Sequence, residues 1–442
     1  MTDTFITRTF VGLQFLKVFI FSAIQLILPL CTAEWAQSQE PLWIQGIVVD
    51  SITGYPIPFA SLSVPGTTRG TSTNEEGRFS IAFGGLSSPP VLLIASLGYR
   101  TNRKELPPEN RSNLVIQLQP APIQLTEVEI VGLTPEEVIR RAVSKIPGNY
   151  GKDSVLLTSY VRVRKTVNQK LAEFAEAILE DLKDGYYSYG RNDLEKKHER
   201  SNWPALLKGR VISDTNLVKA MGDAGKDAFC LSCYFRDDLV EFYPRSILDE
   251  KEFKHHDFFM KEEIKESTGK VYHITFDQKD GVKGRFWKGE LLIDADSFAV
   301  RRITISPSLK AFDQYEKTKT DRRFTINKKP GWIREMPMGH TEINYSDKGG
   351  YWCLSTIRND YYTIFTLPET GQKISIGYRS DMVVTDVSRD RSIIRNFRGN
   401  RQTGVGQRWD QIVGSPDPGF WSSYNFLPVE RALGAEIEKI GK

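Results

Sequence analysis

The chain has 442 residues, of which 40% are hydrophobic and 26% are charged, the composition of an ordinary globular protein. This length is enough for two or three domains with their own cores. The 59 Lys and Arg residues are nearly balanced by 55 Asp and Glu residues, which leaves a net charge of +4. A surplus this small, spread over a large surface, gives no electrostatic footprint for nucleic acid, so we expect no nucleic acid among the partners.

The N-terminus has the pattern of a signal peptide. Arg8 and Lys17 precede an apolar run over residues 18–30 (VFIFSAIQLILPL), and a polar stretch follows. The run is shorter than the about 20 apolar residues of a membrane-spanning helix, so we predict a signal peptide over residues 1–38 and an exported protein. An uncleaved anchor is the alternative. Cys31 raises the question of a lipid anchor, but Leu30 precedes it where a lipoprotein signal has Gly, Ala or Ser.

Residues 43–131 contain short β-type runs separated by turn residues, without a helical period. The turn 74–77 ends in Gly77, which accepts the positive φ that closes a hairpin. Regular spacing of this kind predicts an antiparallel sandwich of about seven strands. The predicted strands are 44–49, 59–64, 71–73, 78–83, 91–96, 114–118 and 127–131.

Three motifs in this region occur in the order of one known family. They are G-x-V-x-D-x-x-T-G-x-P-I from Gly46, G-T-x-x-G-T-x-T-N-x-x-G-x-F-x-I from Gly66, and S-L-G-Y from Ser96. The region resembles the carboxypeptidase regulatory-like (CarboxypepD_reg-like) domain, although Asn74 stands where that family more often has Asp. The resemblance implies a transthyretin-like sandwich at the N-terminus of an envelope protein of Bacteroidetes type. It implies a location in the periplasm or outer membrane of a Gram-negative bacterium. It does not imply peptidase activity.

A helix is predicted to open the second domain. Thr134 and Glu137 have the spacing of a capping box, and Pro135 occupies the first helical position. Apolar residues between 138 and 146 form one stripe, and Pro147 is expected to end the helix. We therefore divide the chain into a signal peptide (1–38), a regulatory-like sandwich (41–132), a helix (133–150) and a β-rich domain of unknown function (151–442).

The remainder is predicted to be β-rich. Residues 154–167 and 171–182 indicate a long hairpin around Asn168 and Gln169, although the second run also has helical propensity. A meander is predicted over 271–276, 287–293 and 298–305, with further strands at 323–328, 339–345, 352–365 and 373–378. The fold class is thus mostly β, with a larger α+β domain built on a curved antiparallel sheet. Such a sheet resembles the half-barrel of lipoprotein carriers, which implies a face that holds acyl chains.

Near the C-terminus, the segment 417–425 (DPGFWSSYN) resembles a closing motif of the same envelope proteins. Its aromatic residues Phe420, Trp421 and Tyr424 predict either a plug packed onto the sheet or an exposed surface that stacks against sugars.

Cys230 and Cys233 have the C-x-x-C spacing of a redox pair. The helix of a βαβ unit that normally lowers a thiol pKa is absent from the surrounding pattern, and two ligands are too few for zinc. We therefore expect a small structural disulfide or two buried thiols, with redox catalysis as the weaker alternative.

The search for catalytic chemistry gives no convincing centre. None of the five histidines has a Glu three residues later, as a zinc carboxypeptidase requires. His255, His256 and Asp257 form the best metal-like cluster, but neighbours on a strand point to opposite faces, so we predict a surface loop there. Nucleophile elbows, phosphate loops and dinucleotide motifs are also missing. We expect no catalytic residue, metal site or cofactor.

These observations favour a non-enzymatic cell-envelope protein with an interaction or ligand-binding role. The expected partner is an unknown envelope protein, a glycan or a lipid, with peripheral association at the outer membrane. A lipid or lipoprotein carrier with a half-barrel apolar cavity is the first alternative, and a hydrolase with an unrecognised site is the second.

Overall fold

The computed structural model describes most of the chain from residue 42 onward. The described residues are 42–67, 69–83, 91–96, 98–106, 109, 111–121, 132–183, 185–186, 204–222, 238–242, 246–266, 269–282, 287–311, 323–326, 328–400, 420 and 427–440. The predicted signal peptide (1–38) and the strand predicted at 127–131 lie outside them.

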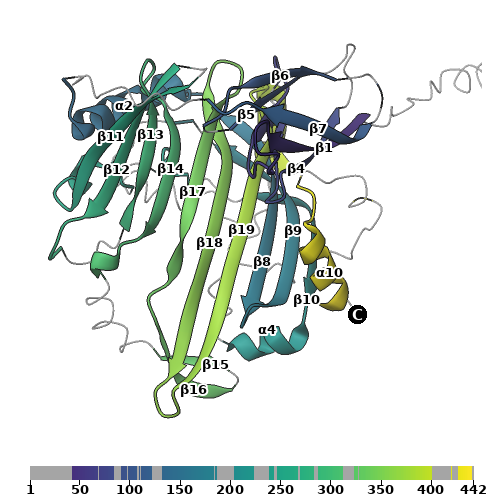
Figure 1. Cartoon of the computed structure of the whole chain (residues 1–442), viewed down its shortest axis with the longest axis vertical. Coiled ribbons are helices and arrows are strands. Elements are labelled where there is room, and N and C mark those ends of the chain that lie inside the picture. The colour runs from purple at the N-terminus through teal and green to yellow at the C-terminus, as the bar shows by residue number, and fades with distance from the viewer. Residues whose placement is uncertain are drawn as a thin grey trace, which may run out of the picture. The chain divides into compact units, whose positions relative to one another are not determined.

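The first part of the chain forms two small sheets (Figure 1). One has the order β4-β1-β7, and the other has the order β3-β2-β5-β6. Buried side chains from both sheets, including Val48, Leu62 and Ile94, form the core. The strands are β1 (Leu42–Asp50), β2 (Ser61–Ser63), β3 (Gly70–Ser72), β4 (Arg78–Phe83), β5 (Val91–Ala95), β6 (Asn102–Glu105) and β7 (Arg111–Leu118).

The predicted sandwich is confirmed, with two differences of detail. Strand β1 pairs with β7 in parallel, whereas the described register of β2 with β3 and β5 is antiparallel. Strand β6 was missed because its sequence, NRKE, has no apolar residue and hence no alternation to detect.

The turn between β3 and β4 explains the departure from the family pattern at Asn74. The backbone N–H groups of Glu76 and Arg78 donate to Asn74 Oδ1, and Gly77 has the predicted positive φ of 70°. The amide Nδ2 of Asn74 donates to the backbone oxygen of Pro428 at 2.9 Å. An ionised Asp has no donor for this bond, so the amide suits this chain in particular.

Helix α2 (Pro135–Asn149) begins as predicted. Glu137 N–H donates to the Thr134 hydroxyl, and Thr134 N–H donates to the Glu137 carboxylate, so both halves of the capping box are present. The stripe is buried, but the expectation that Pro147 ends the helix is wrong. The helix continues to Asn149, and Tyr150 N–H donates to the oxygen of Ile146 after it.

A twelve-stranded sheet forms the rest of the fold. Its order is β10-β9-β8-β19-β18-β17-β14-β13-β12-β11, with β15 and β16 attached beside β18. Figure 1 shows the long strands β17, β18 and β19 at its centre. The strands are β8 (Val155–Val167), β9 (Lys170–Lys183), β10 (Ala205–Ser213), β11 (His256–Glu266), β12 (Gly269–Gln278), β13 (Trp287–Asp294), β14 (Val300–Pro307), β15 (Arg323–Ile326), β16 (Lys329–Arg334), β17 (Met338–Asp347), β18 (Trp352–Leu367) and β19 (Gln372–Ser388).

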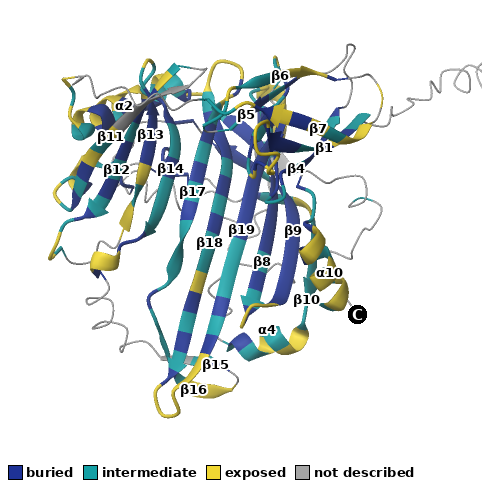
Figure 2. Cartoon of the chain, in the orientation of Figure 1, coloured by how far each residue is buried: buried dark blue, intermediate teal, exposed yellow. Residues whose placement is uncertain are grey.

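The hairpin β8–β9 confirms the strand prediction over the helical alternative. Asn168 and Gln169 both have positive φ, at 47° and 67°, as a two-residue turn between twisted strands requires. Strand β9 also pairs with β10, and Figure 2 shows that β8 and β9 are almost entirely buried. Short helices complete the described fold: α4 (Thr215–Met221), η3 (Glu250–Glu252), η4 (Leu309–Ala311), α7 (Arg391–Asn400) and α10 (Arg431–Ile440).

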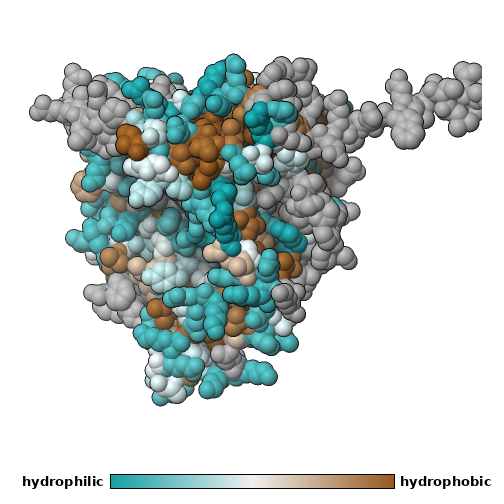
Figure 3. Space-filling view, turned by 45° about the vertical axis from the view of Figure 1, so that its right-hand side comes forward, coloured by the Kyte–Doolittle hydropathy of each residue, from teal (hydrophilic) through white to brown (hydrophobic). Residues whose placement is uncertain are grey.

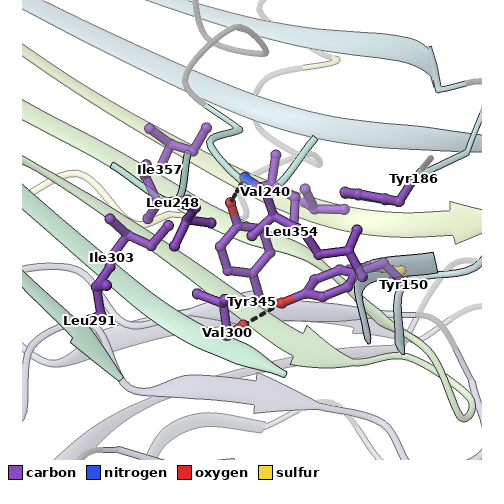
Figure 4. Close-up of a cluster of buried hydrophobic side chains, with 14 of the residues drawn as sticks. Tyr150, Tyr186, Val240, Leu248, Leu291, Val300, Ile303, Tyr345, Leu354 and Ile357 are labelled. Atoms are coloured by element: carbon purple, nitrogen blue, oxygen red, sulfur yellow. Dashed lines mark hydrogen bonds between the residues drawn. The ribbon is translucent and has the colours of Figure 1, made fainter. Parts of the chain in front are cut away.

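The two faces of this sheet carry different chemistry, because successive side chains of a strand point to opposite faces. We call one the cavity face. It carries Ile274, Ile303, Ile343 and Ile357, which are all at most 1% exposed and belong to the main hydrophobic core. Figure 4 shows part of this core, with Tyr345 between Val240 and Val300.

We call the opposite side the tail face. Its residues Tyr160, Phe174 and Ile178 pack against the C-terminal segment 427–440. The same face carries Arg162, which is buried below this segment.

Candidate functional site

A cavity of about 250 Å³ lies on the cavity face. Six neighbouring strands, from β18 to β11, contribute to it together with Leu239 and residues within 246–252. Its lining residues are Leu239, Ser246, Ile247, Glu252, His256, Phe276, Trp287, Ile305, Thr341, Ile343 and Tyr361.

Aliphatic and aromatic side chains dominate the wall. Phe276 and Ile343 are buried, whereas Trp287 is 44% exposed. Phe276 pairs with Gly289 on β13, and a Cβ at Gly289 would lie 2.9 Å from the Phe276 ring. Because Gly289 has no side chain, the Phe276 ring can occupy the space beside it. The geometry gives an apolar wall with an aromatic residue that also reaches solvent.

The polar groups of the cavity contact one another. The Thr341 hydroxyl donates to Asn359 Oδ1 at 2.5 Å and lies 2.9 Å from the Tyr361 hydroxyl. His256 Nδ1 lies 3.2 Å from the backbone oxygen of Glu252. Such pairing lowers the cost of burying polar atoms beside an apolar ligand.

The surface loop predicted at His255–His256 is wrong for His256. This side chain is only 2% exposed and begins β11. Its ring packs edge-on against Phe276, with centroids 5.9 Å apart. The hydrophobic residues Phe258 and Phe276, which follow on β11 and β12, draw the histidine into the core.

A buried ion cluster holds the segment 238–242 against the sheet. Lys183 Nζ donates to Asp238 Oδ2 at 2.6 Å and to Glu241 Oε2 at 2.5 Å, and all three side chains are fully buried. Burial alone would lower the pKa of Lys183, but the two carboxylates raise it above its ordinary value. The lysine is therefore charged, and it fixes the segment that forms one side of the cavity.

Two tyrosines complete this anchor. Tyr186 donates to Asp238 Oδ2 at 2.9 Å, and Tyr345 donates to Asp238 Oδ1 at 2.8 Å. Burial raises the pKa of both phenols well above the ordinary value, and the charge of Asp238 raises it further. Both hydroxyls therefore remain protonated donors. Tyr345 also accepts the backbone N–H of Val240, as Figure 4 shows.

A second buried ion cluster lies on the tail face. Glu176 accepts from Arg162 at 2.9 Å and also pairs with Arg210. Burial by itself would raise the pKa of Glu176, but the two guanidinium groups lower it below the ordinary value. Arg162 donates onward to the backbone oxygens of Leu427 and Pro428. This cluster therefore attaches the C-terminal segment.

Comparison with protein families identifies the first part of the chain. A family model described as a CarboxypepD_reg-like domain matches residues 44–130. Residues 44–130 are a CarboxypepD_reg-like domain. The resemblance in the sequence motifs is thus confirmed. No curated protein matches the chain.

Several solved structures align with the chain at low similarity. A domain described as an outer membrane lipoprotein-sorting protein, from Vibrio parahaemolyticus, is 11% identical with a TM-score of 0.25, and the match covers 60% of this chain and 98% of that one. A DUF1329 family protein from Desulfovibrio piger is 10% identical with a TM-score of 0.26, covering 58% and 92%. A membrane-associated protein of unknown function from Bacteroides fragilis is 9% identical with a TM-score of 0.16, covering 79% and 98%. Similarity at this level carries no function over to this chain.

The predicted aromatic site is described only at Phe420. Downstream of the CarboxypepD_reg-like domain, this ring packs against Tyr160 and Ile178 on the tail face, with Lys208 Nζ 5.4 Å from its centroid. Trp421 and Tyr424 lie outside the described residues, as does the predicted pair Cys230 and Cys233.

Within the described ranges, no group of three His, Cys, Asp or Glu side chains is arranged to hold a metal ion. Cys353 is a buried free thiol, and burial raises its pKa. No described helix is long and apolar enough to cross a membrane. Figure 3 shows a largely hydrophilic surface on which hydrophobic residues gather in separate groups.

Sequence reasoning missed the residues that line the cavity. The alternation of Ile303, Ile305, Thr341 and Ile343 indicates one buried face of a sheet. It does not distinguish a filled core from a core with a space in it. The segment 238–252 carried no recognisable motif, although Asp238 beside Leu239 and Val240 is an unusual mixture of charged and apolar residues.

Proposed function

We propose that this chain is a non-enzymatic protein of the cell envelope that binds one acyl chain, of a lipid or a lipoprotein, in the cavity on the cavity face. The observation that supports this most is the apolar wall of Phe276, Ile305 and Ile343 around a space of about 250 Å³. The proposal takes up the carrier alternative, because the geometry offers a place for a ligand.

The size of the cavity favours a single chain over a bulky ligand. Sites for drug-sized molecules have volumes of about 300–1,000 Å³, and this cavity lies just below that range. Each methylene that leaves water contributes about 0.8 kcal/mol, so even a partly inserted chain gains several kcal/mol. The hydroxyls of Thr341 and Tyr361 already contact each other, so an acyl chain can bind beside them without breaking a bond to water.

The ion cluster supports a preformed site. Lys183, Asp238 and Glu241 fix the segment that faces the strands across the cavity. A ligand that enters a site held open in this way does not have to order that segment, which lowers the entropic cost of binding.

A displacement assay with a fluorescent fatty acid tests the proposal. Ile305→Trp places an indole in the cavity, and we expect the affinity for the probe to fall about tenfold or more. The matched control is Ile364→Trp, a half-buried isoleucine on β18 that does not line the cavity. Equal binding by the wild type and Ile305→Trp, or equal losses in both variants, would contradict the proposal.

The envelope location has its own test. Fractionation of the source cells should find the protein with the periplasm or the outer membrane. Recovery of the full-length chain in the cytosol would contradict this part and would leave acyl binding to be judged by the displacement assay.

A further inference from the structure

A second cavity of about 380 Å³ lies at the start of β8, away from the proposed acyl site. Four cationic side chains line it, namely Lys152, Arg389, Arg391 and Arg395. Three separate chain segments bring them together, and Tyr351 forms a further part of the wall. Asp153 is the single acidic residue among the described lining residues. We call this group of residues the arginine cleft.

Arg389 is held in place at the cleft. Its guanidinium lies over the Tyr351 ring, 4.5 Å from the centroid, and Nη2 donates to Cys353 Sγ at 3.3 Å. Cys353 is buried, so this contact fixes the inner side of the guanidinium. A planar guanidinium restrained on one side can still present other N–H groups in the fork geometry that matches phosphate oxygens.

Arg391 and Arg395 lie near the N-terminus of α7, where positive charge is unfavourable. They lie one turn apart in the first half of α7, and the first turn of this helix contains no acidic residue. A helix N-terminus carries partial positive charge and favours anions, and two cations four residues apart repel each other. The negative charge of Asp390 partly offsets this unfavourable arrangement. Its carboxylate is already used as an acceptor for the Ser392 and Ile393 N–H groups and the Ser392 hydroxyl.

The helix nevertheless has a firm attachment. Ile394 is 7% exposed and packs between Leu156 and Leu182 of the sheet, with Phe397 beside them. The buried isoleucine therefore keeps the arginines on either side of it near the cleft. The cations near this helix end repel one another, and a bound anion would reduce that repulsion further than Asp390 alone does.

We propose that the arginine cleft binds a phosphate group, either as free phosphate or as the head group of an anionic phospholipid. The cleft combines arginines that can donate in pairs to phosphate oxygens with a lysine as an additional point charge, all lining one cavity. This site is independent of acyl binding, and either proposal can fail alone.

The test measures binding of two probes to the full chain at constant ionic strength. One probe is inorganic phosphate, and the other is a vesicle of phosphatidylglycerol diluted into phosphatidylcholine, with pure phosphatidylcholine vesicles as the reference. Removal of two charge-assisted contacts in Arg391→Gln/Arg395→Gln should weaken binding about tenfold or more. Arg391→Lys/Arg395→Lys keeps the charge but loses the paired N–H donors of the guanidinium. Its affinity should therefore fall between those of the wild type and the glutamine variant.

The control is Lys170→Gln/Lys329→Gln, which removes the same charge from exposed positions that do not line the cleft. Its affinity should equal that of the wild type. Phosphate should also raise the melting temperature of the wild type and of the control but not of the glutamine variant.

The two sources of phosphate are separated by the pattern of binding. Binding of inorganic phosphate that competes with the vesicles supports a general phosphate site. Binding of the anionic vesicles without binding of inorganic phosphate supports a lipid head group. Failure to bind either probe, or equal weakening in the glutamine variant and the control, overturns the proposal.

Discussion

The two faces of the large sheet bury charge in different ways. On the cavity face, one lysine serves two carboxylates, and Lys183, Asp238 and Glu241 are all fully buried. On the tail face, Glu176 pairs with two arginines, of which Arg210 is 29% exposed, and Arg162 also pairs with Glu430. The first cluster fixes the segment beside the cavity, whereas the second fixes the C-terminal segment.

This difference shows how replaceable each ion is. A buried charge that loses its partner keeps its desolvation cost, and removal of Lys183 takes one ion-pair partner from both Asp238 and Glu241. Glu176 retains Arg210 when Arg162 is removed. Removal of Lys183 therefore affects two buried carboxylates at once, whereas Glu176 keeps a second cation when Arg162 is removed.

The largest expected effect follows from removing the single cation. Lys183→Met leaves Asp238 and Glu241 buried without it, and we expect a loss of about 3–5 kcal/mol in the free energy of unfolding. Urea denaturation measures this loss. Lys170→Met makes the same chemical change at an exposed position and should alter stability by less than about 0.5 kcal/mol. Equal stabilities of the two variants would refute the role given to Lys183.

Removing one of the two arginines should have a smaller effect. Arg162→Met breaks the pairs with Glu176 and Glu430 and the bond to the backbone oxygen of Pro428. We expect a loss of about 2–3 kcal/mol, smaller than for Lys183→Met because Arg210 still pairs with Glu176. The same urea titration measures it. A loss as large as that of Lys183→Met would show that Arg210 does not compensate.

A third change removes a bond to the backbone oxygen of Pro428, which also accepts from Arg162. Asn74→Asp removes the donor to the Pro428 oxygen and places a carboxylate beside it, which should cost about 1–2 kcal/mol. Asn113→Asp is the control, since Asn113 is exposed. If thermal unfolding of Asn74→Asp matched that of the control, the bond to Pro428 would be unimportant for stability.

The smallest effect concerns the turn between β13 and β14, at an edge that belongs to neither ion cluster. Burial alone would raise the pKa of Asp294, but bonds from Ser297 and the charge of Arg301 lower it below 3.8. A lowered folded pKa gives stability that is present above the unfolded value and lost as pH falls through the folded value. Asp294→Asn should therefore be about 1 kcal/mol less stable at neutral pH, with a difference that shrinks below pH 4. Unfolding measured at several pH values checks this, and a difference that grows on acidification would contradict it.

The parts of the fold that were predictable are those set by neighbouring residues. Asn168 and Gln169 between two apolar runs indicated the β8–β9 hairpin, and the capping box at Thr134 indicated α2. Strand β6 has no apolar residue, so its position depends on its pairing with β5, which local sequence does not record.

The candidate site was much less predictable. Lys183 and Asp238 are 55 positions apart, and neither belongs to a motif that indicates the other. His256 became part of the cavity wall because aromatic residues on two strands surround it. The shape of the space depends on details such as the absent side chain of Gly289, which only the assembled sheet reveals.

The most direct measurement of the central claim is crystallography with a brominated fatty acid. Anomalous scattering from the bromine locates the chain without interpretation of weak density. Acyl binding on the cavity face predicts a bromine peak between Phe276, Ile305 and Ile343 in the wild type, and none there in Ile305→Trp. Bromine bound only on the tail face, or a cavity that contains ordered water at saturating fatty acid, would contradict it.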